Sequence, residues 1–394
     1  MSRMKKGIAL FMALVLACVM LAGCGTEGGK NVIKIGIFEP GTGENAGGGK
    51  QEVLGIRYAH SLEPTVTING ETYQIELVEV DNQSDTSKAP SAAQQLISSK
   101  VSVVLGTYGS GCAIAAGSIF AENKVPAIGC SCTNPQVTAE NDYYFRVCYI
   151  DPFQGTVMAN FALEQGCKKV AVVTQAGDDY SVGLGNYFKQ AFTAAGGEIV
   201  ESSFQTGETD FSAIVAGFAD CDGIFAPSSI ETAPLLIKQI RAVNANCLIM
   251  GGDTWENGKV IENAGTAATN VYLSTFFDEN DESNTKGKTF VTDFKAWLNA
   301  DSSRLNNNGG DDSVAAVSAL GYDAYMVAIE AIKAANSTDG TAIRDALKTV
   351  NMVGVTGDLS FDDKGDAKKN LAYIKTIDVE NGAFKFLKTQ TIAE

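Results

Sequence analysis

Three loops in this sequence combine glycine with short polar side chains, and each loop follows an apolar run and precedes a helical pattern. The first covers residues 106–111 and carries Tyr108, Gly109 and Ser110. Its glycines let the backbone turn sharply, so that successive N–H groups and the Ser110 hydroxyl can point at one anion. This loop predicts a site for a small anionic group.

The other two loops add complementary chemistry. Residues 129–135 offer the Ser131 carbonyl together with the amide and hydroxyl of Thr133. Residues 251–253 place the carboxylate of Asp253 at the end of a later strand. An anion site that faces a carboxylate across a cleft matches the two ends of an α-amino acid.

Each of these polar residues also has a purely structural interpretation. Ser110 could cap the helix that begins near Cys112, because serine is a favoured N-cap. Thr133 could be only a turn residue, and Asp253 could cap the helix that holds Trp255. The aromatic Tyr180, which follows a strand of the second half, could simply pack on the surface.

Catalytic and metal-binding arrangements are not indicated. His60 is the only histidine, so no Ser-His-Asp or Cys-His arrangement can form without it. The glycine-rich stretches lack the Lys and Ser/Thr ending of a phosphate-binding P-loop. The sequence therefore predicts no enzyme activity, no cofactor and no metal site.

Short β-branched strands alternate with helical patterns through most of the chain, which is typical of parallel sheets covered by helices. The rhythm restarts at Asp151-Pro152, which predicts two similar lobes. The fold class is thus α/β, with two doubly wound lobes and a cleft between them. Ligands bind at such a cleft because the carboxyl ends of the strands and the helix N-termini meet there.

The N-terminus has the layout of a cleavable signal peptide. Arg3, Lys5 and Lys6 precede an apolar run over residues 8–20, and Leu21-Ala22-Gly23 leads into Cys24. The apolar run is too short for a membrane-spanning helix, which needs about 20 residues. The alternative is an uncleaved signal anchor with an incidental cysteine.

Composition and charge narrow the class of protein further. A net charge of −16 argues against nonspecific binding to nucleic acid and against lying flat on anionic lipid. The length that remains after removal of the signal peptide suits two domains. Free, mostly buried thiols are expected for the seven cysteines after Cys24, which are Cys112, Cys130, Cys132, Cys148, Cys167, Cys221 and Cys247. Cys130 and Cys132 flank the second loop, where packing at a strand end is the favoured role.

Nearly the whole chain after residue 30 resembles the branched-chain amino-acid-binding proteins, the leucine/isoleucine/valine-type periplasmic binding proteins of the type I fold. Eight motifs in the order of that family carry the resemblance. They are Ile33-Lys34-Ile35-Gly36, Val104-Leu105-Gly106 with Ser110, Ala127-Ile128 with Thr133-Asn134-Pro135, Phe145-Arg146-Val147 with Asp151-Pro152-Phe153-Gln154-Gly155, residues 178–183, Thr209-Asp210-Phe211-Ser212, Tyr322-Asp323-Ala324 and residues 361–366. The Leu-Ala-Gly-Cys sequence resembles a lipobox, which implies that Cys24 carries lipid after cleavage.

The resemblance implies how an amino acid would be held. Ser110 and Thr133 would bind its carboxylate, while the Ser131 carbonyl, the Thr133 hydroxyl and Asp253 would hold its ammonium group. Tyr180 would close over the ligand, and Tyr108, Gly109 and Ser229 would complete the lining of the site.

Three departures from the family pattern bear on which ligand side chain the site would accept. Gly47-Gly48-Gly49 stands where the family often has an aromatic residue, and Ser228-Ser229 stands near an expected tyrosine. Asp253 replaces a longer glutamate. Loss of two aromatics predicts a larger or wetter pocket, and a ligand side chain that is bulkier or more polar than that of leucine.

The family also implies an organisation and a role. It implies a signal peptide (1–23), a lipid-anchored tether (24–30), a first lobe from 31–150 plus 277–357 and a second lobe from 151–276 plus 358–394, joined by three crossings. The expected role is to deliver an amino acid to the permease subunits of an ABC importer. The protein is expected to be a monomer, and lipid alone is expected to hold it at the outer face of the cell membrane. The alternatives are a ligand-sensing domain, an importer component for another small solute and a lipoprotein hydrolase. The absence of a nucleophile–base pair argues against the hydrolase.

Overall fold

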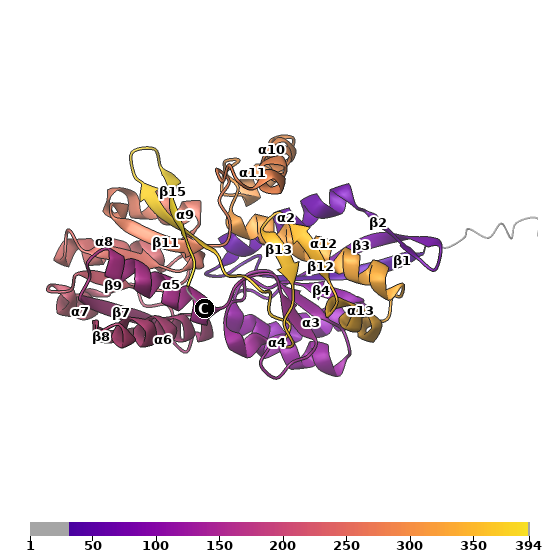
Figure 1. The fold of residues 1–394 in the computed structure, drawn as a ribbon, viewed down its shortest axis with the longest axis horizontal. Helices are drawn as coiled ribbons and strands as arrows, with labels where there is room; N and C mark the ends of the chain where they lie inside the picture. Colours follow the sequence, from indigo (N-terminus) through magenta and orange to yellow (C-terminus); the bar gives the residue numbers. More distant parts are fainter. Residues whose placement is uncertain (1–30, 393–394) are drawn as a thin grey trace, which may run out of the picture.

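Two mainly parallel sheets form the frame of the molecule in the computed structural model, which describes residues 31–392 (Figure 1). The expected signal peptide, the tether and Cys24 lie outside the described residues. Among the residues that are described, no helix combines the length and the apolar character needed to cross a membrane.

The first sheet has the strand order β2-β3-β1-β4-β5-β6. Its strands are β1 (Val32–Glu39), β2 (Thr65–Ile68), β3 (Glu71–Asp81), β4 (Val103–Leu105), β5 (Ala127–Gly129) and β6 (Tyr144–Arg146). All neighbours pair in parallel except β2, which pairs antiparallel with β3 at the edge. With four residues, β2 is too short to show a clear alternation in the sequence.

The second sheet has the order β15-β14-β11-β10-β9-β7-β8. Its strands are β7 (Lys169–Ala176), β8 (Glu198–Gln205), β9 (Gly223–Phe225), β10 (Leu248–Gly251), β11 (Val271–Thr275), β14 (Ala372–Asp378) and β15 (Ala383–Gln390). The last two strands add an antiparallel edge. A separate hairpin pairs β12 (Asn351–Gly354) with β13 (Gly357–Ser360).

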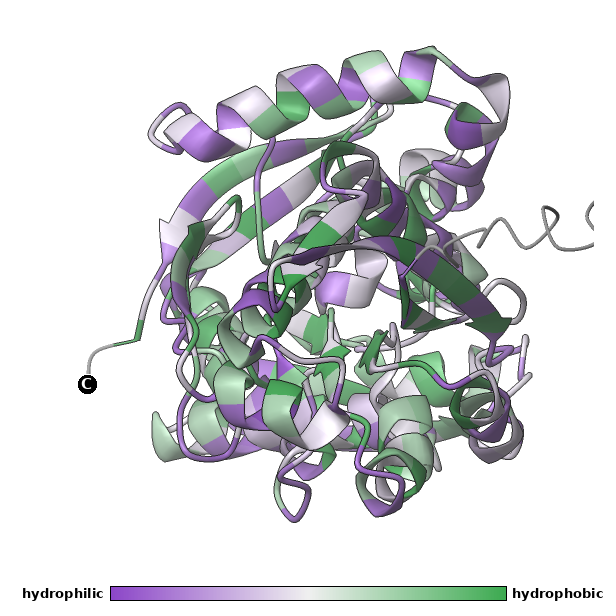
Figure 2. Ribbon diagram, turned by 90° about the vertical axis from the view of Figure 1, so that its right-hand side faces the viewer, coloured by the Kyte–Doolittle hydropathy of each residue, from purple (hydrophilic) through white to green (hydrophobic). Residues whose placement is uncertain are grey.

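Helices cover both sheets, and the central strands β4, β5, β6, β9 and β10 are wholly buried, whereas β3, β8 and β15 keep exposed residues. The first sheet is accompanied by α2 (Ala46–Leu62), α3 (Ala89–Ser98), α4 (Ser110–Glu122), α10 (Thr285–Asn299), α11 (Ser302–Asn307), α12 (Ala316–Ala335) and α13 (Gly340–Leu347). The second is accompanied by α5 (Asp151–Glu164), α6 (Asp179–Ala194), α7 (Ser212–Val215), α8 (Ala233–Val243) and α9 (Gly258–Ala264). Hydrophilic and hydrophobic segments alternate along the outer helices (Figure 2), as expected for helices with one face on a core.

Close packing between α2 and α12 fixes the position of the first helix. A side chain at Gly55 would lie 1.9 Å from the Ser318 carbonyl, and one at Gly321 would lie 2.3 Å from the Glu52 carbonyl. The two helices can approach this closely only because these positions are glycine. The distant segment α10 packs on the same region, where Phe290 and Phe294 contact the ring of Tyr58.

The chain passes between the two sheets after β6, after β11 and before β14, which gives the three expected crossings. The third crossing comes later than the boundary expected between residues 357 and 358. The backbone of Arg146 in β6 pairs with Gly365 and Ala367, so this stretch extends the first sheet. The sequence pattern does not show this pairing, because it joins residues about 220 positions apart.

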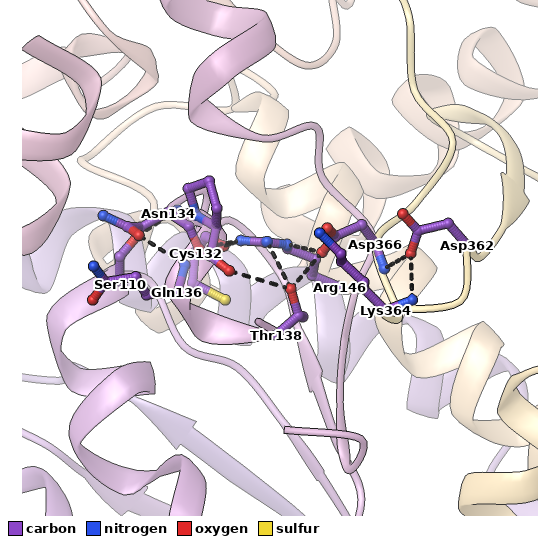
Figure 3. A network of polar contacts seen from close by, with 10 residues as sticks. Ser110, Cys132, Asn134, Gln136, Thr138, Arg146, Asp362, Lys364 and Asp366 are labelled. Atoms are coloured by element: carbon purple, nitrogen blue, oxygen red, sulfur yellow. Dashed lines mark hydrogen bonds and ion pairs between the residues drawn. The ribbon is translucent and has the colours of Figure 1, made fainter. Parts of the chain in front are cut away.

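A buried guanidinium ties the C-terminal stretch to the second loop (Figure 3). Arg146 is fully buried and its Nε donates to Asp366 Oδ1 over 2.6 Å. Its Nη1 donates to the carbonyls of Cys132 and Asn134, and its Nη2 donates to Thr138. A charge removed from water requires such partners, so this side chain fixes residues 132–138 against the strand ends.

We expect Arg146→Leu to lower the free energy of unfolding by about 3–5 kcal/mol, because the substitution leaves Asp366 buried without its cation. Urea unfolding followed by circular dichroism measures this change. The matched control is Arg57→Leu, which removes an exposed, bidentate ion pair with Glu79. Its cost should be about 0–1 kcal/mol. Equal costs for the two variants would contradict the structural role of Arg146.

Candidate functional site

The three predicted loops converge on one cavity between the lobes, with about 380 Å³ of space not filled by protein atoms. Only about 20 Å³ of this space admits the centre of a water molecule, far less than the roughly 300–1,000 Å³ of ligand pockets, so the cavity is nearly closed in this arrangement. Seven of the eight residues predicted for the site line the cavity, namely Tyr108, Gly109, Ser110, Ser131, Tyr180, Ser229 and Asp253. The eighth, Thr133, does not line it.

The first loop presents Ser110 at the start of α4. Gly109 precedes the helix with a φ of 145°, a conformation suited to glycine. The Ser110 hydroxyl does not cap the helix, and instead accepts a hydrogen bond from the backbone N–H of Asn134 over 3.1 Å. Ser110 therefore joins the first and second loops, and the first N–H groups of α4 need partners from outside the helix.

Thr133 is fully buried and is not among the residues that line the cavity. Its carbonyl accepts the N–H of Asp151. Its hydroxyl lies close to the buried carboxyl group of the same residue, without a well-aligned hydrogen bond, and burial raises the pKa of that carboxyl group to about 8. Thr133 therefore faces Asp151 and does not reach the cavity surface.

Asp253 carries the only predicted carboxylate of the site, and it is 2% exposed. Gln154 Nε2 and the Tyr180 hydroxyl both donate to its Oδ1, over 2.9 Å and 3.0 Å. Burial raises the pKa of Asp253 to about 6. Within residues 31–392 no lysine or arginine pairs with this carboxylate, so its Oδ2 is left for a donor that the protein does not supply.

The glycines before Asp253 are required by close contacts. A side chain at Gly252 would lie 2.2 Å from the Tyr180 hydroxyl, and one at Gly251 would lie 2.1 Å from the Trp255 ring. Asp253 opens the short 3-10 helix η3 (Asp253–Trp255) but is not its N-cap, which is Gly252. Tyr180 is 7% exposed and is held by Asp253, so it is not a surface packing residue.

Three further residues line the cavity and were not predicted: Asn45, Asp178 and Thr254. In the sequence, Asp178 is noted only as part of the motif at residues 178–183. It caps α6 by accepting the N–H of Ser181, and burial raises its pKa to about 6. Each of the three residues lies in a segment that follows the carboxyl end of a strand, and that position is the signal that could have identified them.

The prediction of a larger or wetter pocket is not met by the structure. The glycine-rich segment is largely helical, because α2 begins at Ala46 and includes Gly47, Gly48 and Gly49. A side chain at Gly48 would lie 2.2 Å from the ring of Tyr108. The ring of Tyr108 thus occupies the space that the missing aromatic would have filled.

Contacts across the cleft hold the two lobes together around the cavity. The Tyr108 hydroxyl donates to the Thr254 carbonyl over 3.3 Å, and the Ile230 N–H donates to Asn45 over 3.2 Å. Asn134 also donates to the Asp179 carbonyl over 2.7 Å. These three hydrogen bonds join residues of the first lobe to residues of the second, so the structure represents a closed arrangement.

An acidic cluster accepts hydrogen bonds from the first loop and from the second loop, which both belong to the first lobe. Glu39 accepts the N–H of Tyr108 over 2.7 Å, and Glu52 accepts the hydroxyl of Ser131. Carboxylate oxygens of both and the Cys130 sulfur lie within 4.8 Å of one another, a set that could hold a metal ion and was not predicted. Burial raises the pKa of Glu52 to about 7, and burial followed by the charge of Glu52 raises that of Glu39. The two carboxyl groups are therefore expected to retain at least one proton near neutral pH.

Stability should decrease as the pH rises through this range. The pKa of Glu52 is about 7 in the folded protein and 4.5 in an unperturbed chain. Between these values the folded protein binds more protons than the unfolded chain, so the free energy of unfolding falls with increasing pH. The melting temperature should be lower at about pH 8 than at about pH 5, and Glu52→Gln should reduce this difference. The exposed Glu140→Gln serves as control, and an unchanged pH dependence in Glu52→Gln would contradict the assignment.

A second buried ionic group supports the Asp253 loop from behind. Lys375 of β14 contacts Glu256 over 2.5 Å and Asp278 over 2.9 Å, and all three are buried. The other oxygen of Glu256 accepts from Thr275 and from the N–H of Ala316 at the start of α12. Glu256 thus connects the Asp253 loop to the second crossing and to the first lobe.

The seven cysteines after Cys24 are all buried and free, as predicted. Cys130 and Cys132 belong to the apolar cores of the first lobe, and burial raises the pKa of both thiols. His60 lies near the far end of α2, where its Nε2 contacts the Ile75 carbonyl over 3.1 Å and its ring packs on Tyr325. It is not part of the cavity.

Comparison with known proteins decides the family. Residues 32–383 match the family model described as periplasmic binding protein. The chain belongs to the periplasmic binding protein family. The predicted resemblance and fold class are therefore confirmed, and the family consists of extracytoplasmic solute-binding proteins.

Relatives of this binding protein include proteins that are named for binding amino acids. The Leu/Ile/Val-binding protein homolog 1 of Brucella abortus is 30% identical over 365 residues, covering 91% of this chain and 93% of that protein. The leucine-binding protein LivK of Thermotoga maritima has a TM-score of 0.83 and 34% identity, with 91% and 99% coverage.

Solved complexes in the same fold contain different ligands. The substrate-binding protein LivJ of Streptococcus pneumoniae, solved with isoleucine, has a TM-score of 0.79 and 30% identity, with 92% and 99% coverage. A solute-binding protein of Rhodopseudomonas palustris, solved with benzoate, has a TM-score of 0.79 but 22% identity, with 92% and 98% coverage. The second comparison shows the fold alone.

Proposed function

We propose that this binding protein holds a free α-amino acid in the cavity between its lobes and delivers it to the permease subunits of an ABC importer. The observation that carries the proposal is a buried carboxylate without a protein cation, Asp253, placed across one cavity from the hydroxyl and amide groups of the first lobe. An ammonium group would supply the missing cation, and the N–H groups at the start of α4 would receive the carboxylate.

The charge of the cavity favours an amino acid over an aromatic acid such as benzoate. Asp178 and Asp253 both line the cavity, and none of its ten lining residues is lysine or arginine. A ligand that carries only a carboxylate would place a third negative charge beside these two groups. Such an arrangement is unfavourable in a buried site, whereas a zwitterion brings its own positive charge.

The closed arrangement suggests how delivery would operate. Hydrogen bonds across the cleft join Tyr108 to Thr254 and Asn134 to Asp179, so closure and ligand enclosure would occur together. The closed monomer would then dock on the permease and open about the three crossings. The Thr133 hydroxyl would donate a hydrogen bond to a ligand carboxylate once its loop moves toward the cavity.

Asp253→Asn tests the ammonium site. The amide keeps the shape of the side chain but loses the charge, so we expect the dissociation constant for the bound amino acid to rise about 10- to 100-fold. Thermal-shift screening with the twenty amino acids and benzoate would identify the ligand first, and calorimetry would then measure the constants.

The stability of the ligand-free variant separates a binding defect from misfolding. Its melting temperature should equal or exceed that of the parent, because an unpaired buried charge has been removed. The exposed Asp363→Asn serves as the matched control and should bind normally. Unchanged binding by Asp253→Asn, or a response to benzoate in place of amino acids, would overturn the proposal.

The proposed location is the outer face of the cell membrane, with lipid on Cys24 as the anchor. We expect Cys24→Ala to move the protein from the membrane fraction to the soluble fraction, because one acylated residue supplies the attachment. Cell fractionation with mass spectrometry of the N-terminal peptide measures this. Cys18→Ala is the matched control and should remain lipid-modified. Retention of Cys24→Ala in the membrane would contradict the anchor.

A further inference from the structure

The part of the cavity that would receive a ligand's side chain is polar. Ser110 and Ser131 would face the carboxylate end, and Asp253 would face the ammonium end. The rest of the lining contains the polar side chains of Asn45, Asp178, Ser229 and Thr254, with no aliphatic residue among the ten that line the cavity.

Tyr108 keeps this part of the cavity short. Its ring packs against Gly48, its backbone N–H donates to Glu39 over 2.7 Å, and its hydroxyl donates to the Thr254 carbonyl over 3.3 Å. Hydrogen bonds therefore hold both the backbone and the hydroxyl of Tyr108, and the residue is 4% exposed. Moving it aside for a long ligand side chain would break contacts with both lobes.

Hydrogen-bonding capacity remains on the polar lining. Asn45 uses its Oδ1 to accept the Ile230 N–H, which leaves its Nδ2 as a donor. The Ser229 hydroxyl donates to the Thr232 hydroxyl and accepts the Thr232 N–H over 3.3 Å, which leaves one lone pair as an acceptor. Asp178 accepts the Ser181 N–H through Oδ1 and retains a second oxygen. A ligand hydroxyl could use one donor and one acceptor from this set.

We propose that the cavity selects an α-amino acid with a short hydroxyl-bearing side chain, serine or threonine, over the branched aliphatic amino acids. This inference rests on the proposed function and specifies its ligand. A branched aliphatic side chain would meet the ring of Tyr108. It would also cover the remaining donor of Asn45 and the remaining acceptors of Asp178 and Ser229 without giving them a hydrogen bond. Unpaired buried polar groups each weaken binding by about one to two orders of magnitude.

Isothermal titration of the ligand-free protein with serine, threonine, alanine, leucine, isoleucine and valine tests the proposal. Serine or threonine should bind about 100-fold more tightly than leucine, and at least about tenfold more tightly than alanine. Leucine binding as tightly as serine and threonine would overturn this inference and leave the proposed function intact. Alanine binding equal to that of serine and threonine would also overturn it. Binding of benzoate with no response to any amino acid would overturn both.

Two variants locate the discrimination. Ser229→Ala should remove most of the preference for serine and threonine over alanine, while the exposed Ser98→Ala should retain it. Tyr108→Ala should raise the affinity for leucine relative to serine, because it lengthens the cavity. Melting temperatures of both variants confirm folding. A Ser229→Ala protein that folds and keeps the full preference would contradict the assigned position of the ligand side chain.

Discussion

A carboxylate buried without a cation is the constraint on which the rest of this site depends. Asp253 is almost fully buried, is held by Gln154 and Tyr180, and has no lysine or arginine against it in the described part of the chain. An ionised carboxylate in such a place is unfavourable unless it is protonated or paired. Its raised pKa and the cavity beside it are two consequences of the same arrangement.

The surrounding structure serves to hold this carboxylate opposite the loops of the first lobe. Arg146 fixes the second loop through carbonyls, Glu39 and Glu52 fix Tyr108 and Ser131, and Lys375 fixes Glu256 behind Asp253. These supporting groups are charged or acidic and almost fully buried. A site framed by hydrogen-bonded buried groups is preorganised, which reduces the ordering cost of binding.

The sequence predicted much of this fold and site, because both depend on local patterns. Strand-like runs that end in glycine and short polar residues located the three loops, and Asp151-Pro152 marked the start of the second lobe. Seven of the eight predicted residues line one cavity, although ligand binding by any of them stays a prediction.

The features that were missed depend on contacts between residues far apart in the chain. Because Arg146 pairs with residues 365–367, the third crossing lies later in the chain than the predicted boundary. The cluster of Glu39, Glu52 and Cys130 joins three separate segments. Tyr108 fills the space above Gly48, so the absence of an aromatic from that segment did not enlarge the pocket. Sequence spacing shows which residues can reach a cleft, but it does not show which side chain occupies the space there.

A crystal structure of the protein with its bound amino acid tests the central claim most directly. The account predicts that the ligand nitrogen lies about 2.7–3.2 Å from a carboxylate oxygen of Asp253 and that the ligand carboxylate lies against Ser110 and the start of α4. A ligand in the reverse orientation, or one bound in the separate cavity lined by Tyr149, Lys369 and Tyr373 at the crossings, would contradict it.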